Sequence, residues 1–299
     1  MYNNHFEFSE LPFTLTPDTS FFLNKKSHQD ALNTTLLALK HCEGFIKIVG
    51  EVGTGKTLLS RILLARLTPS FVTAYIPNPY LTPAELKSFV AQEVGAKIDK
   101  AMPSHELMST LYRRLVQHHR NGKQVVLIID EAQAMPRDTV ECLRLLTNLE
   151  TEKRKLLQVV ILGQPELDSL LSRKDLRQLK QRIVFSEYLR PLDFSATHSY
   201  VKYRLSRVCT NQRTLFSFAA VKLVKKASGG IPRLINIICH KALICAYGRG
   251  HKTITAWHVA RAVMDTAESK KWISVLSSVI AIEAFSPKSR PVSAKVLAS

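Results

Sequence analysis

The chain has 299 residues, enough for one large domain or two smaller ones. Its 45% apolar and 22% charged residues are typical of a globular protein and exclude a mostly disordered chain or a collagen-like repeat. The 42 Lys and Arg against 24 Asp and Glu give a net charge of +18, and a surplus of 13 falls in residues 191–299. This charge predicts either an anionic partner for the C-terminal third (nucleic acid, acidic lipid or an acidic protein) or a solvated basic surface.

Cysteine spacing and the chain ends argue against export and membrane insertion. The five cysteines form no Cys-x-x-Cys pair, so neither a zinc site nor a disulfide framework is expected. Glu7 and Glu10 lie where a signal peptide needs a basic end and an apolar run. The apolar stretch 272–285 contains Glu283 and is shorter than the roughly 20 residues of a membrane span. We expect a cytoplasmic protein without a transmembrane segment, with peripheral attachment to the inner membrane left open.

The first two thirds of the chain alternate short apolar runs with helical patterns. Residues 1–28 are expected to form an arm on a folded body, followed by a helix over 29–42. Strands are expected at 45–49, 71–76, 125–129, 156–162 and 183–189, and helices at 57–67, 83–94, 104–121, 138–150 and 166–180. This alternation predicts an α/β core of three layers with a parallel sheet over residues 29–190. Lys47 interrupts the first strand, so it must pair or snorkel, and we expect that strand to be partly exposed there.

The strands stop after Pro191. Helical patterns at 193–209, 216–227, 231–247 and 256–267 predict a small all-helical lid domain over residues 191–268. The pattern then decays into Ser, Pro and Lys, which predicts a flexible tail over 269–299.

A glycine-rich loop stands between the first expected strand and the helix that follows it. The segment Gly50-Glu-Val-Gly-Thr-Gly-Lys-Thr57 fits Gly-x-x-x-x-Gly-Lys-Thr in the strand-to-helix setting that this phosphate loop requires. Glycines allow backbone N–H groups to point at phosphate oxygens, Lys56 can reach the β- and γ-phosphates, and Thr57 can ligate Mg²⁺. The predicted cofactors are ATP and Mg²⁺. The predicted nucleotide-binding residues here are Gly50, Glu51, Val52, Gly53, Thr54, Gly55, Lys56, Thr57 and Leu58.

The apolar run 125–129 ends in two acidic residues. This position puts Asp130 at the carboxyl edge of the sheet, where it can hold the magnesium ion. Glu131 follows it and can polarise the attacking water as a general base. A carboxylate beside the metal ligand favours hydrolysis over phosphoryl transfer to another substrate.

Taken together, these motifs resemble the AAA+ ATPases, and specifically the ExeA/GspA type found with secretion and pilus systems. The resemblance runs over about residues 5–267. The residues that carry it are Pro12-Phe13, Thr16-Pro17-Asp18, Phe21-Phe22, Gly44-Phe45, the glycine-rich loop, Asp130-Glu-Ala-Gln133, Gly163-Gln-Pro-Glu-Leu167 and Gln181-Arg-Ile183.

The resemblance implies roles for further residues. Gln164, after the fourth strand, would sense the γ-phosphate, although it also fits a plain turn before Pro165. Asn78, after the second strand, would hold Glu131 away from the water, although an Asn-Pro turn explains it equally well.

Three arginines also take their expected roles from the resemblance. Arg182, before the fifth strand, would be the arginine finger that reaches the nucleotide of a neighbouring subunit, with Arg177 as the alternative. Arg233, in Gly229-Gly-Ile-Pro-Arg233, would sense nucleotide from the lid of the same chain, unless the segment is only a helix-capping loop. A finger that acts on a neighbour implies a homo-oligomer, either a ring or a filament.

The sequence therefore predicts an ATP-hydrolysing AAA+ protein. By resemblance, its turnover would drive assembly of a type IV (MSHA-type) pilus or related secretion machinery, with inner-membrane components as partners. A DNA-binding, transposition-type AAA+ regulator is the alternative, because the basic lid suits DNA. A nucleotide-bound scaffold without turnover is the third hypothesis.

Overall fold

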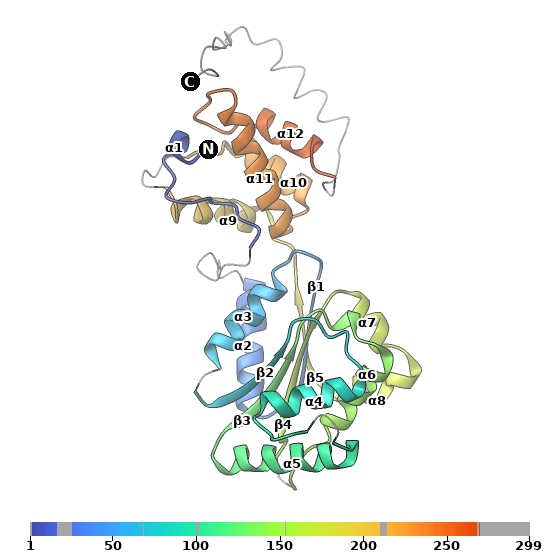
Figure 1. Ribbon diagram of the computed structural model, residues 1–299. Helices are drawn as coiled ribbons and strands as arrows, with labels where there is room; N and C mark the ends of the chain where they lie inside the picture. The colour runs from blue at the N-terminus through green and yellow to red at the C-terminus, as the bar shows by residue number, and fades with distance from the viewer. Residues whose placement is uncertain are drawn as a thin grey trace. The chain divides into compact units, whose positions relative to one another are not determined.

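The computed structural model describes residues 2–16, 26–67, 69–99, 102–152, 154–209, 214–267 and 269 (Figure 1). The chain divides into two compact units, one formed by Thr16–Pro191 and the other by Met1–Leu15 together with Leu192–Ser299. Within the second unit, the expected tail lies outside the described residues apart from Ser269. The motif residues Pro17, Asp18, Phe21 and Phe22 also lie outside them.

The unit Thr16–Pro191 is built on a parallel sheet. Its five described strands lie in the order β2-β3-β4-β1-β5, and every neighbouring pair is parallel. The strands are β1 (Phe45–Gly50), β2 (Phe71–Ile76), β3 (Gln124–Ile129), β4 (Leu157–Gly163) and β5 (Ile183–Leu189). The predicted α/β core with a parallel sheet is confirmed, because the strands occupy the predicted positions and helices cover both sides.

Helices form a layer on each face of this sheet (Figure 1). One layer contains α2 (Lys26–Lys40) and α3 (Lys56–Arg66). The other contains α4 (Pro83–Glu93), α5 (Ser104–Arg120), α6 (Arg137–Leu146), α7 (Glu166–Leu171) and α8 (Arg177–Lys180), with the 3₁₀ turns η2 (Ala132–Ala134) and η3 (Lys174–Leu176). In β3, Val125 and Leu127 face the second layer and Val126 and Ile128 face the first, which explains why this strand shows no polar alternation.

Two helices of the α/β unit are shorter than the sequence predicts, and the helices expected over 193–209 and 256–267 also end early, at Ser206 and Met264. The expected helix over 166–180 is broken into α7, η3 and α8, because Arg173 takes an extended conformation between α7 and η3. The expected helix over 138–150 ends at Leu146, where the Thr147 hydroxyl donates to the Arg144 carbonyl (2.9 Å).

Lys47 is buried in the middle of β1. The strand is buried along its whole length, so the expectation that it would be partly exposed at Lys47 was wrong. The Lys47 ammonium forms an ion pair with Asp168 of α7 and donates to the Tyr188 hydroxyl of β5 (3.3 Å). Burial alone would lower the pKa of Lys47, but these hydrogen bonds raise it. Because the charge has two partners, the strand can be covered by α7 rather than left open to water.

The second unit is helical. Its helices are α1 (Asn3–Phe6), α9 (Phe194–Ser206), α10 (Phe218–Ser228), α11 (Pro232–Tyr247) and α12 (Ala256–Met264). None of the helices in the described part of the chain is long and apolar enough to cross a bilayer.

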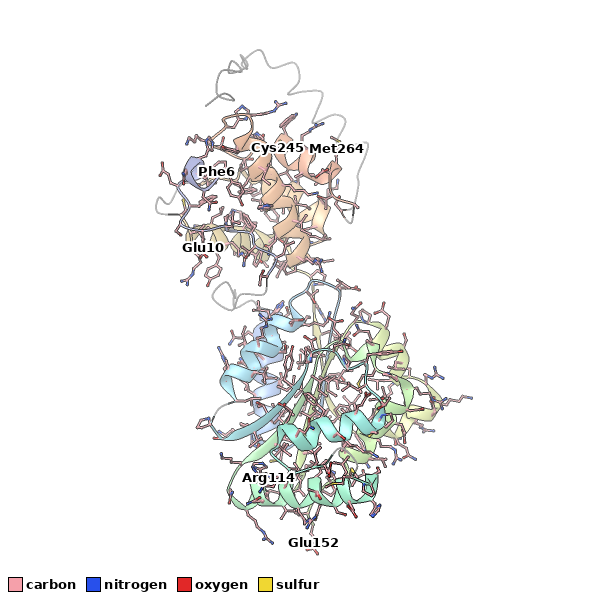
Figure 2. All side chains as sticks on the ribbon, in the orientation of Figure 1. Phe6, Glu10, Arg114, Glu152, Cys245 and Met264 are labelled. Carbon is pink, nitrogen blue, oxygen red and sulfur yellow. The ribbon has the colours of Figure 1, made fainter. Side chains whose placement is uncertain are left out.

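Residues 2–15 belong to the helical unit and contribute several side chains to its core. Tyr2 and Phe6 are buried, and Phe6 lies among the side chains of this unit (Figure 2). The Tyr2 hydroxyl is 2.8 Å from Nδ1 of His240 on α11, and Arg204 of α9 donates to the Pro12 carbonyl (2.7 Å). Apolar burial and hydrogen bonds thus hold the start of the chain against helices that follow it by about two hundred residues.

A glycine pair joins α10 to α11. Gly229 ends α10 in the left-handed conformation, and Gly230 follows with φ of +85°. A Cβ at position 230 would lie 2.1 Å from the carbonyl oxygen of Leu192. The backbone N–H of Leu192 in turn donates to the Gly230 carbonyl (2.8 Å). Gly230 is therefore required by both its backbone conformation and its close approach to Leu192.

Replacement of Gly230 by alanine should destabilise the helical unit far more than the same change at Gly250. Gly250 has φ of +70° and nothing within 4 Å of an added Cβ, so Gly250→Ala should cost about 1 kcal/mol for conformation alone. Gly230→Ala adds a backbone clash and should cost about 3 kcal/mol. Urea denaturation of both variants, followed by far-UV circular dichroism, measures the difference, and equal losses would contradict the proposed close contact.

Candidate functional site

The glycine-rich loop links the carboxyl end of β1 to the start of α3. Gly53 and Gly55 have φ of +78° and +102°, values that favour glycine. A Cβ at Gly50 would lie 2.6 Å from Oγ1 of Thr54, so the loop also closes tightly against its own first residue. The predicted nucleotide-binding residues, from Gly50 to Leu58, thus form one curled loop and the first turn of α3.

Lys56 is the first residue of α3, and its side chain turns back over the loop. It is 4% exposed, and its ammonium donates to the carbonyl oxygens of Gly50 (2.8 Å) and Glu51 (3.2 Å). Burial lowers its pKa, and the carboxylates of Glu131 and Asp130 oppose this effect. Because its hydrogen-bond partners are neutral carbonyls, a phosphate would offer this ammonium a stronger acceptor.

The two predicted magnesium ligands lie together. Asp130 follows β3 and is 1% exposed, and its carboxylate accepts hydrogen bonds from the Thr57 hydroxyl and from the Glu131 N–H (2.9 Å). Burial raises the pKa of Asp130. A carboxylate and a hydroxyl are ligands that Mg²⁺ accepts, so this pair fits the ion, with phosphate and water oxygens completing its coordination.

Glu131 stands next to this pair in an unusual backbone conformation. Its φ of 50° and ψ of 37° lie in the left-handed region, which is rare for a residue with a side chain. Its Oε2 accepts hydrogen bonds from the side-chain amides of Gln133 (2.6 Å) and Gln164 (2.9 Å). Burial alone would raise the pKa of Glu131, but these two donors and the Lys56 charge lower it. Glu131 is therefore held as a carboxylate.

Gln133 connects the ends of two strands. While its amide nitrogen donates to Glu131, its amide oxygen accepts the backbone N–H of Gln164 (3.0 Å), the residue that follows β4. The sequence assigned Gln164 to the site but gave Gln133 no role, although it belongs to the motif Asp130-Glu-Ala-Gln133. Its position two residues after Glu131 was the available signal, and the turn η2 brings the two side chains together.

Comparisons with known proteins agree with this geometry. Residues 40–171 match the family described as AAA domain. The chain is 39% identical over 267 residues to General secretion pathway protein A of Aeromonas hydrophila. The aligned region covers 89% of this chain and 49% of that protein. It is also similar to the Aeropyrum pernix ORC2 protein solved in ADPNP-ADP complexes, with a TM-score of 0.60 and 16% identity over 86% of this chain and 71% of that one. The ORC1 protein of the same organism, in complex with DNA, gives a TM-score of 0.61 and 18% identity over 85% and 69%.

The fold is that of an AAA+ P-loop protein. The identity to General secretion pathway protein A supports a relationship to AAA+ proteins of the ExeA/GspA type. The chain spans about half the length of this curated relative, with 49% of it covered.

Asn78 lies apart from Glu131's described partners in this AAA+ core. It is exposed in the loop after β2, and its side-chain oxygen accepts the Tyr80 N–H at 3.4 Å. This contact is the one that a turn would make. In the described residues Glu131 accepts from Gln133 and Gln164, and the holding role expected of Asn78 stays a prediction.

The three arginines lie away from the loop or in the other unit. Arg182 precedes β5 and donates to the Thr147 hydroxyl (3.1 Å). Because β5 runs parallel to β1, this is the opposite end of the sheet from the phosphate loop of the same chain. Arg177 is exposed on α8, and Arg233 is exposed in the first turn of α11 in the helical unit. A role of Arg182 or Arg177 toward a neighbouring subunit stays a prediction.

Removal of one amide should raise the pKa of Glu131. We expect Gln164→Leu to do so, because the carboxylate loses a donor that stabilises its charged form. Titration of ¹³C-labelled glutamates by NMR, with Glu131→Gln for assignment, measures this change. Gln158→Leu is the matched control, since Gln158 is also on β4 but donates to Leu39 and Gln124. An unchanged titration in Gln164→Leu would contradict the assigned hydrogen bond.

Proposed function

We propose that this protein binds ATP with Mg²⁺ and hydrolyses it. The observation that carries the proposal is Glu131, held as a carboxylate beside the Asp130–Thr57 pair and near the Lys56 ammonium. These are the groups that hydrolysis of a phosphoanhydride requires, since a base must stand close to the cation and to the phosphate clamp.

Each residue has a distinct task in this mechanism. The N–H groups of the loop bind the phosphates, and Lys56 exchanges the Gly50 and Glu51 carbonyls for phosphate oxygens. Thr57 and Asp130 would hold Mg²⁺, which would neutralise phosphate charge when bound. Glu131 accepts the proton of the attacking water.

Gln164 provides the link between nucleotide and base. Its amide donates to Glu131 in the structure described here, so this donor competes with water for the carboxylate. A γ-phosphate near the end of β4 would offer the amide a stronger acceptor. We propose that Gln164 transfers its hydrogen bond from Glu131 to that phosphate and so exposes the base only when ATP is bound.

The active unit would be a homo-oligomer, either a ring or a filament. Arg182, or Arg177, would reach the γ-phosphate of the neighbouring subunit, and Arg233 would contact nucleotide from the helical unit. The position of Arg182 supports this proposal. It lies at the end of the sheet opposite the phosphate loop of its own chain, so it cannot contact a nucleotide bound to that loop.

The output of turnover would be assembly of an envelope-spanning machine. The 39% identity to General secretion pathway protein A over 89% of this chain supports a secretion-related role. Within that role we propose the MshM kind, which serves biogenesis of the MSHA-type IV pilus. Inner-membrane components of such a system are the expected partners, and the protein would act from the cytoplasmic side.

DNA binding is the second candidate function. The surplus of 13 positive charges in residues 191–299 favours it, as does the similarity to an ORC1 protein solved with DNA. A transposition-type regulator should be retained on duplex DNA at near-physiological salt. Retention only at very low salt would count against this candidate.

Two substitutions test the catalytic assignment. Glu131→Gln should keep nucleotide binding and lower phosphate release about a hundredfold or more, since it removes the base. Lys56→Ala should abolish nucleotide binding, because the phosphates lose their ammonium. Glu141→Gln on α6, whose carboxylate pairs with Arg144, is the control that should behave as wild type. Equal phosphate release from wild type and Glu131→Gln would remove the hydrolysis proposal.

The partner is tested with the same Glu131→Gln variant, which should remain trapped with ATP. Its eluate from a pull-down, run with and without DNA, should contain inner-membrane pilus or secretion proteins. Recovery of nucleic acid alone would favour the DNA-binding candidate instead.

A further inference from the structure

His28 is a buried histidine that the proposed chemistry does not use. It lies in the first turn of α2, is 7% exposed, and its Nε2 is 2.7 Å from the Thr54 carbonyl oxygen in the phosphate loop. Because a carbonyl only accepts, Nε2 carries the proton of this bond. Burial lowers the pKa of His28, which keeps the ring neutral near pH 7. The helix before β1 thus supplies a hydrogen-bond donor to the loop after β1.

This bond fixes the orientation of one peptide unit. The unit joins Thr54 to Gly55, and because a peptide is planar and trans, its C=O and N–H point in opposite directions. A carbonyl aimed at α2 therefore turns the Gly55 N–H away from α2.

The His28 bond adds a restraint on the side of this peptide where a glycine follows it. Gly55 can take both positive and negative φ, so it does not restrict the orientation of this peptide on its side, whereas Thr54 is held on the other side by bonds from its N–H (3.2 Å) and hydroxyl (2.8 Å) to the Glu51 carbonyl. The imidazole also fits closely here, since a Cβ on Gly55 would lie 3.4 Å from Nε2 of His28. Glycine at position 55 thus leaves room for the ring that restrains it.

We propose that His28 is a positioning residue for the phosphate site: it holds the Thr54 carbonyl so that the Gly55 N–H is presented to a nucleotide phosphate. The inference rests on the proposed nucleotide binding. Through this hydrogen bond, the affinity for nucleotide depends on the contact between the first turn of α2 and the phosphate loop. The ring itself does not touch the phosphate.

Three substitutions at His28 separate the hydrogen bond from the volume of the ring. His28→Phe keeps an aromatic ring without the donor and should weaken binding of fluorescent ATP and ADP analogues about tenfold. His28→Gln has an amide long enough to reach Thr54 and should recover most of the affinity. His28→Asn has the same amide on a shorter side chain and should bind as weakly as His28→Phe.

His118→Phe is the matched control. His118 is also a buried histidine of the same unit, and its Nε2 is 2.8 Å from the Val94 carbonyl, far in sequence from the phosphate loop. Its loss should lower thermal stability without changing nucleotide affinity. In steady-state hydrolysis, His28→Phe should raise KM with a much smaller change in kcat, whereas general destabilisation would not change KM selectively.

The outcomes are distinguishable. Wild-type affinity in His28→Phe, or an equal loss in His118→Phe, would overturn the inference while leaving the proposed function intact. Failure of the wild-type chain to bind any nucleotide would overturn both. If His28→Phe does not fold, the comparison of His28→Gln with His28→Asn decides, because equal affinities in these two would also overturn the inference.

Discussion

The site depends on a buried ammonium that must always have acceptors. Lys56 is 4% exposed, and in the absence of a stronger partner its acceptors are two carbonyls of the loop from which it extends. That arrangement requires the backbone to curl through Gly53 and Gly55. It also requires nearby carboxylates that stabilise the positive charge of the Lys56 ammonium. The glycines, Asp130 and Glu131 thus all help to stabilise the buried charge of Lys56. A phosphate would stabilise this charge more strongly than the carbonyls do.

A chain of amides extends this arrangement from one strand end to the next. Gln133 donates to Glu131 and accepts from the backbone of Gln164, whose side chain returns to Glu131. The carboxylate, both glutamines and the ends of β3 and β4 are therefore positioned together. A change at any member alters the charge and direction of the group expected to act on water, which is how a distant ligand contact can affect catalysis.

The sequence predicted the strands and the loop because their signals are local. An apolar run, a glycine spacing and two consecutive acids are each contained in eight residues or fewer, and backbone geometry then decides where they lie. The contacts between distant residues could not be found in this way. Lys47 and Asp168 are 121 positions apart, His28 and Thr54 are 26 apart, and Glu131 and Gln164 are 33 apart. Only the folded sheet brings these pairs together, so Lys47 was expected to leave its strand partly open and His28 was given no role. The helix expected over 166–180 failed for a different reason, since Arg173 takes an extended conformation that apolar periodicity does not reveal.

The helical unit is made of two separate stretches of chain, with the whole α/β unit inserted between them. Two covalent crossings, after Leu15 and before Leu192, therefore connect the two bodies where a simple tandem arrangement would have one. A truncation of the first 15 residues would therefore remove one of these connections and would also take the buried side chains of Tyr2 and Phe6 out of the helical unit.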